Sequence, residues 1–222
     1  MEGATAQMSF TQVDDLIRRD HNALNAEDVC IFLREYKANA GFEGETNSLI
    51  WNLKKKPSER LTKGGWQYKG QAIRQVSREF ARSLRPEWLD EATLVPIPGS
   101  KAPDHADYDD RMEQICNGIR DGLDVRSIVK QTASMEASHT AGDGNRASVE
   151  ELIEAYKIDE TLTNPAPVNI GIFDDVLTVG RHYRAMHTVL SQRFPGVPIT
   201  GIFIARTIHP NPFQDIDLSS AF

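Results

Sequence analysis

The chain has 222 residues, two cysteines and a formal net charge of −7, and this length fits one α/β domain that buries roughly 70% of its unfolded surface. Cys30 and Cys116 are not spaced like metal ligands, and so few cysteines favour a reducing cytoplasm. The chain also lacks the 18 consecutive apolar residues that would predict a membrane span. The negative charge disfavours a broad nucleic-acid surface and leaves a local basic groove open.

Residues 1–66 predict a helical cap that precedes the main core. Apolar residues recur at helical spacing in two stretches of this part. The first stretch comprises Phe10, Val13, Leu16 and Ile17, and the second, which Asn25 is placed to cap, comprises Val29, Phe32, Leu33 and Tyr36. Residues 48–56 predict a short helix or an extended element.

Three consecutive lysines, Lys54, Lys55 and Lys56, end this element. A lysine triplet is usually a solvated end, and the alternative is that one of the three reaches a pyrophosphate. Trp51 and Trp66 also have two interpretations. Their rings stack on a nucleobase, or they pack against other side chains within the cap, which is the commoner role of large aromatic residues.

Residues 67–222 predict an α/β core with a mainly parallel sheet flanked by helices. Apolar strands alternate with amphipathic helices here, which implies parallel strands joined by right-handed crossovers. We expect strands at residues 93–98, 125–130, 168–173 and 197–205. We expect helices around residues 73–84, 108–123 and 181–190, and a further helix that begins at the capping box Ser148-Val149-Glu150-Glu151.

A long polar segment, residues 131–146, has no apolar periodicity. A stretch of this length inside a compact domain is either a mobile lid over a charged site or a solvated surface loop. The residue pattern alone leaves both interpretations open.

The most informative stretch is residues 168–180, an apolar strand followed by an acidic pair, a tight turn and a helix. The strand would deliver Asp174 and Asp175 to the carboxyl end of the sheet, where open α/β folds place their ligands. Two carboxylates there can accept hydrogen bonds from the vicinal hydroxyls of a ribose. The turn from Leu177 to Gly180 lets backbone N–H groups converge on a phosphate, to which the helix near Arg181 presents its positive end. The alternative is a helix start capped by Asp175.

This stretch resembles the phosphoribosyl pyrophosphate (PRPP) motif of type I phosphoribosyltransferases, an apolar strand followed by Asp-Asp (or Glu-Asp), two apolar residues and Thr-Thr-Gly-x-Thr. The matching residues are Asp174, Asp175, Val176, Leu177, Thr178 and Gly180. Val179 and His182 stand where the family has threonines that help hold the 5′-phosphate. Receiver domains and haloacid dehalogenase-type phosphatases also have an acidic pair after a strand, but they lack the Thr-x-Gly turn at this spacing.

Three segments follow the order seen in ComF-type phosphoribosyltransferase-like proteins, and the resemblance covers residues 48–206. Residues 95–101 are similar to the family's Pro-x-Pro pyrophosphate loop, and residues 128–158 are similar to its polar lid, with Arg146 as the closing arginine. The acidic pair and its turn come third. The chain lacks the family's amino-terminal four-cysteine zinc module, and His139 stands at the lid position usually held by Gln.

The resemblance implies a type I phosphoribosyltransferase-like fold and a Mg²⁺-dependent reaction, in which a nitrogen nucleophile displaces pyrophosphate from PRPP. Carboxylates beneath the sugar would stabilise the positive charge of the transition state, and cations would stabilise the leaving group. The Mg²⁺ ion would be held through PRPP, with Asp174 and Asp175 in reach. The implied catalytic residues are Asp174, Asp175, Lys101 and Arg146. The implied PRPP- and phosphate-binding residues are Pro98, Gly99, Ser100, Leu177, Thr178, Val179, Gly180, Arg181, His182, Lys54 and Arg111.

Two functions stay open at this point. The chain is a PRPP-dependent transferase, or it is a related protein that senses PRPP, a ribose 5-phosphate-type ligand or a nucleotide without turnover, inside a larger assembly. A homodimer and a partner protein are left open as well. Arg111 has a simpler alternative role, because it follows a run of carboxylates at a helix start with which it could pair, namely Asp104, Asp107, Asp109 and Asp110.

Overall fold

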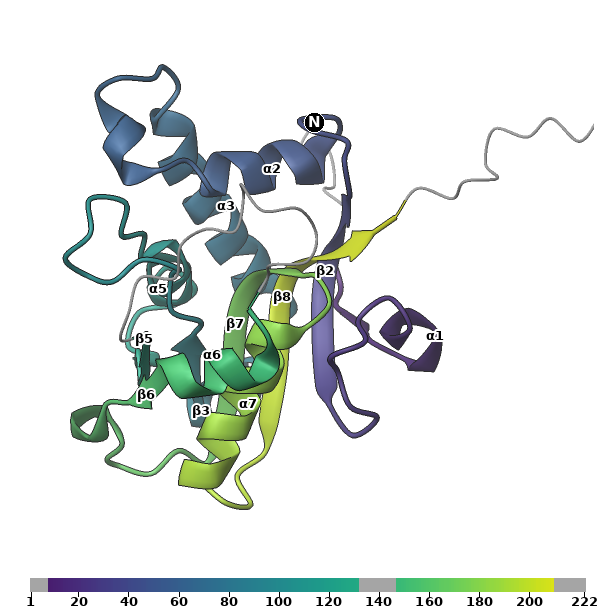
Figure 1. Ribbon diagram of the computed structural model, residues 1–222, viewed down its shortest axis with the longest axis vertical. Coiled ribbons are helices and arrows are strands. Elements are labelled where there is room, and N and C mark those ends of the chain that lie inside the picture. Colours follow the sequence, from purple (N-terminus) through teal and green to yellow (C-terminus); the bar gives the residue numbers. More distant parts are fainter. Residues whose placement is uncertain (1–7, 132–146, 210–222) are drawn as a thin grey trace, which may run out of the picture.

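A six-stranded sheet forms the centre of the computed structural model, which describes residues 8–131 and 147–209 (Figure 1). From one edge to the other, the strands are β1 (Thr11–Gln12), β2 (Val29–Lys37), β8 (Ile199–Ile208), β7 (Asn169–Leu177), β3 (Ala92–Pro96) and β4 (Asp124–Val125). β1 is antiparallel to β2, and all other neighbouring pairs in this sheet are parallel. The predicted α/β class with a mainly parallel sheet is therefore confirmed.

Helices cover both faces of this sheet. α6 (Val149–Ala155) and α7 (Arg181–Arg193) pack on one face, while α2 (Glu45–Leu53), α3 (Gln67–Ser83), α4 (Pro86–Glu91) and α5 (Arg111–Asn117) pack on the other. The remaining short elements are α1 (Asp15–Arg18), η1 (Pro57–Arg60), η2 (Glu160–Leu162) and a separate antiparallel pair, β5 (Val129–Gln131) and β6 (Tyr156–Ile158). Each face of the sheet thus has its own apolar core.

The central strand β8 contributes to both cores. Ile202 and Ile204 are buried on the side of α2 to α5, and Phe203 is buried on the side of α6 and α7. A strand that is buried on both faces has a continuous apolar sequence, as parallel sheets require. The middle of the sheet is therefore packed on both faces, and the polar residues lie at its carboxyl edge.

The helix predicted around residues 29–36 is wrong, because these residues form β2, which pairs in parallel with β8. Cys30 and Phe32 are buried in one core, whereas Ile31 and Leu33 pack against the other. This two-residue alternation is that of a strand. Residues 1–66 were predicted as a helical cap, yet they contribute two strands to the main sheet, and α2 is the longest helix among those of residues 8–66.

Other predicted elements are confirmed with changed limits. The side chain of Ser148 accepts a hydrogen bond from the backbone of Glu151, and the capping box begins α6 as predicted. The strand predicted at residues 125–130 divides into β4 and β5, which belong to different sheets. The strand predicted at residues 168–173 continues to Leu177 and so includes the acidic pair.

None of the helices in the described ranges is long and apolar enough to span a membrane.

Candidate functional site

The acidic pair lies near the carboxyl end of β7, between β8 and β3. Asp174 is partly exposed, and Asp175 is 4% exposed. The backbone N–H of Asp175 donates to Oδ1 of Asp174 over 2.7 Å, so the side chain of Asp174 is held against the backbone of its neighbour. Because β2, β8, β7 and β3 are parallel, their carboxyl ends meet at this edge, as predicted for a ligand site.

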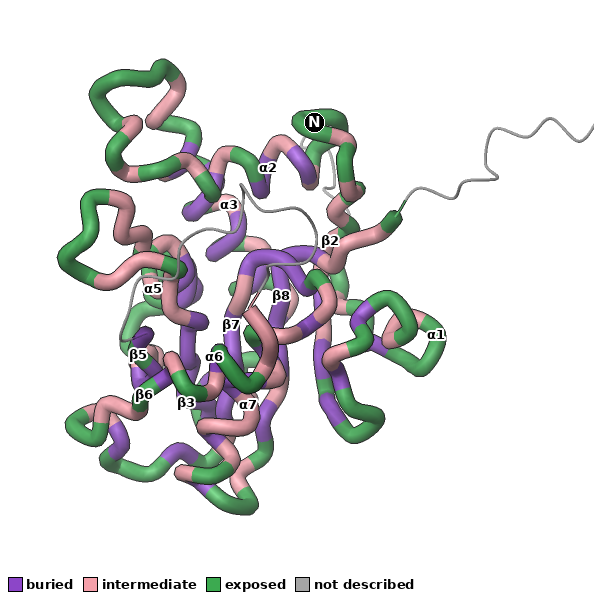
Figure 2. Tube along the Cα trace, in the orientation of Figure 1, coloured by how far each residue is buried: buried purple, intermediate pink, exposed green. Residues whose placement is uncertain are grey.

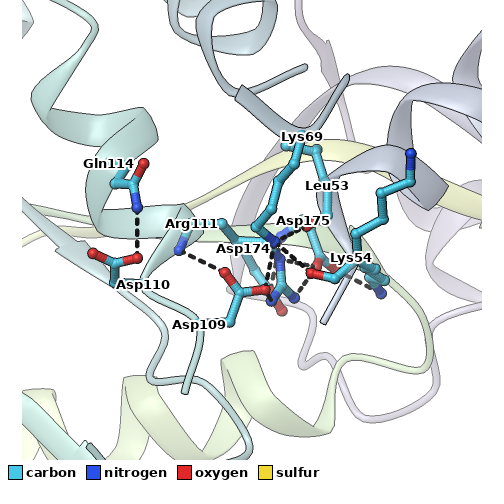
Figure 3. Close-up of polar contacts among 10 residues, drawn as sticks. Leu53, Lys54, Lys69, Asp109, Asp110, Arg111, Gln114, Asp174 and Asp175 are labelled. Carbon is cyan, nitrogen blue, oxygen red and sulfur yellow. Dashed lines mark hydrogen bonds and ion pairs between the residues drawn. The ribbon is translucent and has the colours of Figure 1, made fainter. Parts of the chain in front are cut away.

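Asp175 forms ion pairs with two cations from different elements (Figure 3). Nζ of Lys54, the residue directly after α2, is 3.0 Å from Oδ1 of Asp175. Nη2 of Arg111, the first residue of α5, is 2.5 Å from Oδ2. The structure therefore brings Lys54 and Arg111 to the acidic pair, although they are far apart in the sequence.

A second carboxylate, Asp109, extends this cluster. Its Oδ2 is 2.8 Å from Nη1 of Arg111 and 2.8 Å from Nζ of Lys69. The pairing of Arg111 with Asp109 was one predicted alternative, and its pairing with Asp175 was not predicted. Lys69 also donates to the carbonyl of Leu53, the last residue of α2, and to that of Lys55 just beyond it. Its ammonium group thus joins the end of α2 to the start of α5.

Lys69 was missed by sequence reasoning, although a signal was present. It lies in α3 on the same face as Ile73, Val76 and Phe80, which are buried apolar residues. A lysine in phase with an apolar face must find partners inside the protein, because an unpaired buried charge is costly. The position therefore indicated a buried polar partner, but the sequence could not identify it.

The two carboxyl groups differ in their electrostatic environment. Burial raises the pKa of Asp174, and the negative charge of Asp175 raises it further. Burial also opposes ionisation of Asp175, but the charges of Lys54 and Arg111 outweigh it and hold the pKa of Asp175 below its ordinary value. The pair therefore has one firmly ionised member and one that takes up a proton more readily.

The predicted pyrophosphate loop leaves β3 beside β7, where the backbone N–H of Ile97 donates to the carbonyl of Phe173 over 2.9 Å. The loop continues with Pro98, Gly99, Ser100 and Lys101. A Cβ atom at Gly99 would lie 3.1 Å from the carbonyl oxygen of Asp109, so glycine allows the loop to approach the ion-pair cluster closely. The carbonyl of Ser100 accepts a hydrogen bond from the side chain of Gln131, while Lys101 takes no part in the cluster.

The predicted phosphate turn follows β7 directly. Leu177 is buried within the strand, and Thr178, Val179 and Gly180 form the turn before α7. Gly180 has a φ of +92°, a conformation that favours glycine. Within residues 8–131 and 147–209, no oxygen accepts a hydrogen bond from the backbone N–H groups of Thr178, Val179 and Gly180. These groups are therefore free to bind an anion at the start of the helix.

The loop after α1 packs against this turn and forms hydrogen bonds with it. Nδ1 of His21 hydrogen-bonds the carbonyl of Thr178, and the N–H of Ala23 donates to the carbonyl of Val179 over 2.9 Å. The side chain of Leu24 fills the space beside Gly180, where an added Cβ would lie 2.8 Å from Leu24 Cδ2. His21 is fully buried and was also missed, because its contact joins segments that are remote in the sequence.

The remaining predicted residues lie around the start of α7. Arg181 is its first residue, and Nδ1 of His182 hydrogen-bonds the hydroxyl of Tyr156 over 2.7 Å. His182 thus connects the turn to the end of α6. Arg146, His139 and most of the predicted lid at residues 131–146 lie outside the described residues. No group of three or more His, Cys, Asp and Glu side chains within the two described ranges could hold a metal ion.

No protein-family model matches the chain, and a search of curated proteins found no match.

Proposed function

We propose that this protein binds PRPP at the carboxyl edge of β7 and transfers its phosphoribosyl group to a nitrogen acceptor, with release of pyrophosphate. The observation that carries the proposal is the sequence of polar groups along β7 and α7. An ionised carboxylate at Asp175 is followed within five residues by a turn whose backbone N–H groups have no acceptor among the described residues. This spacing suits a ribose beside its 5′-phosphate.

In the proposed reaction, the carboxylates of the site contact the ribose and the cations contact the leaving pyrophosphate. Asp174 and Asp175 accept hydrogen bonds from the ribose hydroxyls and stabilise the positive charge that the ribose gains when the bond to pyrophosphate breaks. Lys54 and Arg111, which neutralise Asp175 in the ligand-free state, turn toward the pyrophosphate oxygens when the ribose takes their place at the carboxylate. Charge balance within the site is kept in both states.

The proposed ligand carries Mg²⁺, which would draw negative charge away from the leaving pyrophosphate. Both oxygens of Asp175 contact cations, and Oδ1 of Asp174 accepts a backbone hydrogen bond. These carboxylates suit a metal that enters with the pyrophosphate and keeps several waters, as Mg²⁺ prefers, rather than a preformed cage of carboxylates. Among the described contacts, Oδ2 of Asp174 is the one of these four carboxylate oxygens without a hydrogen bond or ion pair, so Asp174 would be the residue to hold the metal.

Asp175→Asn tests the assignment. A hydrogen bond to a charged group contributes about 1.5–3 kcal/mol, so the variant should bind PRPP and Mg²⁺ about 10- to 100-fold more weakly in isothermal titration. Asp90→Asn is the matched control, because Asp90 lies on α4 and forms an exposed ion pair with Arg120. Equal affinity of Asp175→Asn and wild type, with both proteins folded by circular dichroism, would contradict the ribose contact.

A non-catalytic PRPP sensor is the second candidate. Val179 and His182 lack the hydroxyls of the family motif, and His182 is bound to Tyr156. These departures favour binding without turnover. Pyrophosphate release in a screen of nitrogen acceptors separates the candidates, since a sensor binds PRPP saturably and releases none with any acceptor.

A further inference from the structure

Apart from Lys54, the corner between α2 and α3, residues 51–68, is not accounted for by the proposed function. It contains the lysine triplet and both tryptophans that the sequence analysis left with two interpretations. In Figure 1 this corner projects at the upper left, above the sheet, and Figure 2 shows it as mostly exposed or intermediate. We refer to it below as the α2–α3 corner.

Aromatic rings line a groove at the α2–α3 corner. Trp51 is 50% exposed, and its ring lies against that of Phe42, which is 59% exposed, with 4.2 Å between the ring centroids. Together with Trp66 they line a groove of about 290 Å³, whose charged lining is Lys55, Lys63 and Glu59. Large aromatic side chains grouped at an exposed groove mark an interaction site more often than single exposed apolar residues do.

The same corner is strongly basic within an acidic protein. Within residues 51–68 the cations are Lys54, Lys55, Lys56, Arg60 and Lys63 and the carboxylate is Glu59, so the segment has a net charge of +4 in a chain of −7. Two carboxylates from elsewhere contact it, Asp175 at Lys54 and Asp107 at the backbone of Ser58. Lys56 and Arg60 are exposed and form no close ion pair with another described residue, although the charge of Lys56 helps to lower the pKa of nearby Asp107. Lys63 pairs with Glu59 at the surface, which is a weak interaction that a ligand can replace.

The aromatic rings and the cations of this corner together indicate the chemical class of molecule that would bind to it. A purely apolar partner would leave the cations unpaired, and a simple polyanion would leave the rings uncovered. A duplex hides the faces of its bases, whereas a single strand presents flat bases for stacking at regular distances from its phosphates. We propose that the α2–α3 corner binds single-stranded nucleic acid, with a base stacked on Trp51 and Phe42 and phosphates at Lys56, Arg60 and Lys63.

Fluorescence anisotropy with a labelled 12-nucleotide oligothymidylate tests this proposal. Trp51→Ala should weaken binding at least about fivefold, because stacking on an aromatic ring contributes about 1–3 kcal/mol for each base. Lys56→Gln should weaken binding and lower the salt dependence by about 0.7 in the slope of log K against log salt. Leu61→Ala, at an exposed aliphatic residue of the same corner, and Lys37→Gln, at an exposed lysine elsewhere, should leave the affinity unchanged.

Several outcomes would overturn the proposal. These are unchanged binding by Trp51→Ala, equal affinity for a duplex or for polyphosphate, and absence of binding at low salt. Self-association of the chain that depends on Trp51 would assign the corner to a second copy instead. If Trp51→Ala does not fold, quenching by the oligonucleotide in the double variant Trp66→Phe/Trp88→Phe, in which Trp51 is the one tryptophan left, reports on Trp51 directly. The assay contains no PRPP, so its result is independent of the proposed transferase activity.

Discussion

At the scale of single residues, the candidate site is a chain of alternating charges. Lys54 and Arg111 meet at Asp175, and Arg111 and Lys69 meet at Asp109 (Figure 3). Each cation comes from a different helix or helix end, so the charges also fix the positions of α2, α3 and α5 at the edge of the sheet. Loss of one member should therefore affect stability as well as binding.

Lys69→Met should lower the free energy of unfolding by about 3 kcal/mol. The variant keeps the packing volume but leaves Asp109 with one cation fewer and leaves the carbonyls of Leu53 and Lys55 without this donor. Lys63→Met is the control, because it removes an exposed ion pair and should cost at most about 0.5 kcal/mol. Urea denaturation at neutral pH measures both, and a loss below 1 kcal/mol for Lys69→Met would be inconsistent with the role assigned to Lys69.

Asp174 should make the protein less stable as the pH rises. Burial and the charge of Asp175 raise the pKa of Asp174 from the ordinary 3.8 to about 7, so the folded state holds this proton more tightly than the unfolded state does. Its unfavourable contribution therefore grows between about pH 4 and pH 7 and is complete above pH 7. Asp175 has a lowered pKa, and its favourable contribution is lost only when the pH falls below 3.8.

Asp174→Asn removes this titration and should be more stable than wild type at pH 8 and similar to it at pH 4.5. The asparagine oxygen can still accept the hydrogen bond from the N–H of Asp175. Urea denaturation of both proteins across this pH range gives the difference in the free energy of unfolding, in which the other titrating groups cancel. A difference that does not change with pH would show that the pKa of Asp174 is not raised.

At the scale of elements, the phosphate turn depends on a segment far from it in the sequence. The loop of residues 21–24 holds the carbonyl groups of Thr178 and Val179, which leaves the N–H groups of the turn directed away from this support. α7 then follows without a side-chain cap at Gly180, so the positive end of a helix of 13 residues is available to an anion.

Gly180→Ala should destabilise the protein more than Gly196→Ala. Both glycines have a positive φ, +92° and +82°, so both variants lose about 1 kcal/mol or more from backbone strain. Only at Gly180 would the new Cβ meet a side chain, Leu24 Cδ2 at 2.8 Å, whereas nothing lies within 4 Å at Gly196. Thermal denaturation measures the two losses.

Adding Leu24→Ala to Gly180→Ala separates the clash from the backbone strain. The shorter side chain at position 24 leaves room for the new Cβ, so the double variant should lose less stability than the two single variants together. Strict additivity would mean that Leu24 does not restrict position 180. Titration with ribose 5-phosphate reports whether the shape of the turn also matters for binding.

Local signals predicted several elements well. The capping box at Ser148 and Glu151 depends on residues three apart, and the strand and turn of residues 168–180 contain their own apolar run and glycine. The helix assigned to residues 29–36 failed because the residues Val29, Phe32, Leu33 and Tyr36 fit a helical period by chance. Pairing with β8 outweighs that local pattern, and a single sequence does not reveal this distant partner.

The candidate site could be predicted only in part for the same reason. Asp174 and Asp175 belong to one local motif, which located the edge of the sheet where they lie. Lys69 and His21 find their partners at distant positions, Leu53, Asp109 and Thr178, so no spacing in the sequence connects them. The predicted residue Arg146 lies outside the described residues, and its role stays a prediction.

At the scale of the whole molecule, the two apolar cores stabilise the fold, and the charged edge of the sheet forms the candidate binding site. Residues of β7 and β8 are buried between helices on both sides, which makes the sheet the stable part of the structure. Polar groups gather where the strands end, and the basic α2–α3 corner adjoins that edge through Lys54, which contacts Asp175. A ligand at the edge and one at the corner would therefore compete for, or share, the same lysine.

The pairing of β2 with β8 also has a consequence for biosynthesis. Val29 pairs with Thr200, and Lys37 pairs with Ile208, so a strand made early by the ribosome waits for a partner that emerges roughly 170 residues later. At about 5–20 residues per second, the apolar run Val29-Cys30-Ile31-Phe32-Leu33, which β1 covers on its other edge, stays without its β8 partner for roughly 10–30 seconds. Chaperone contacts with nascent chains should concentrate on this run, and they should end once residues 199–208 have left the ribosomal tunnel.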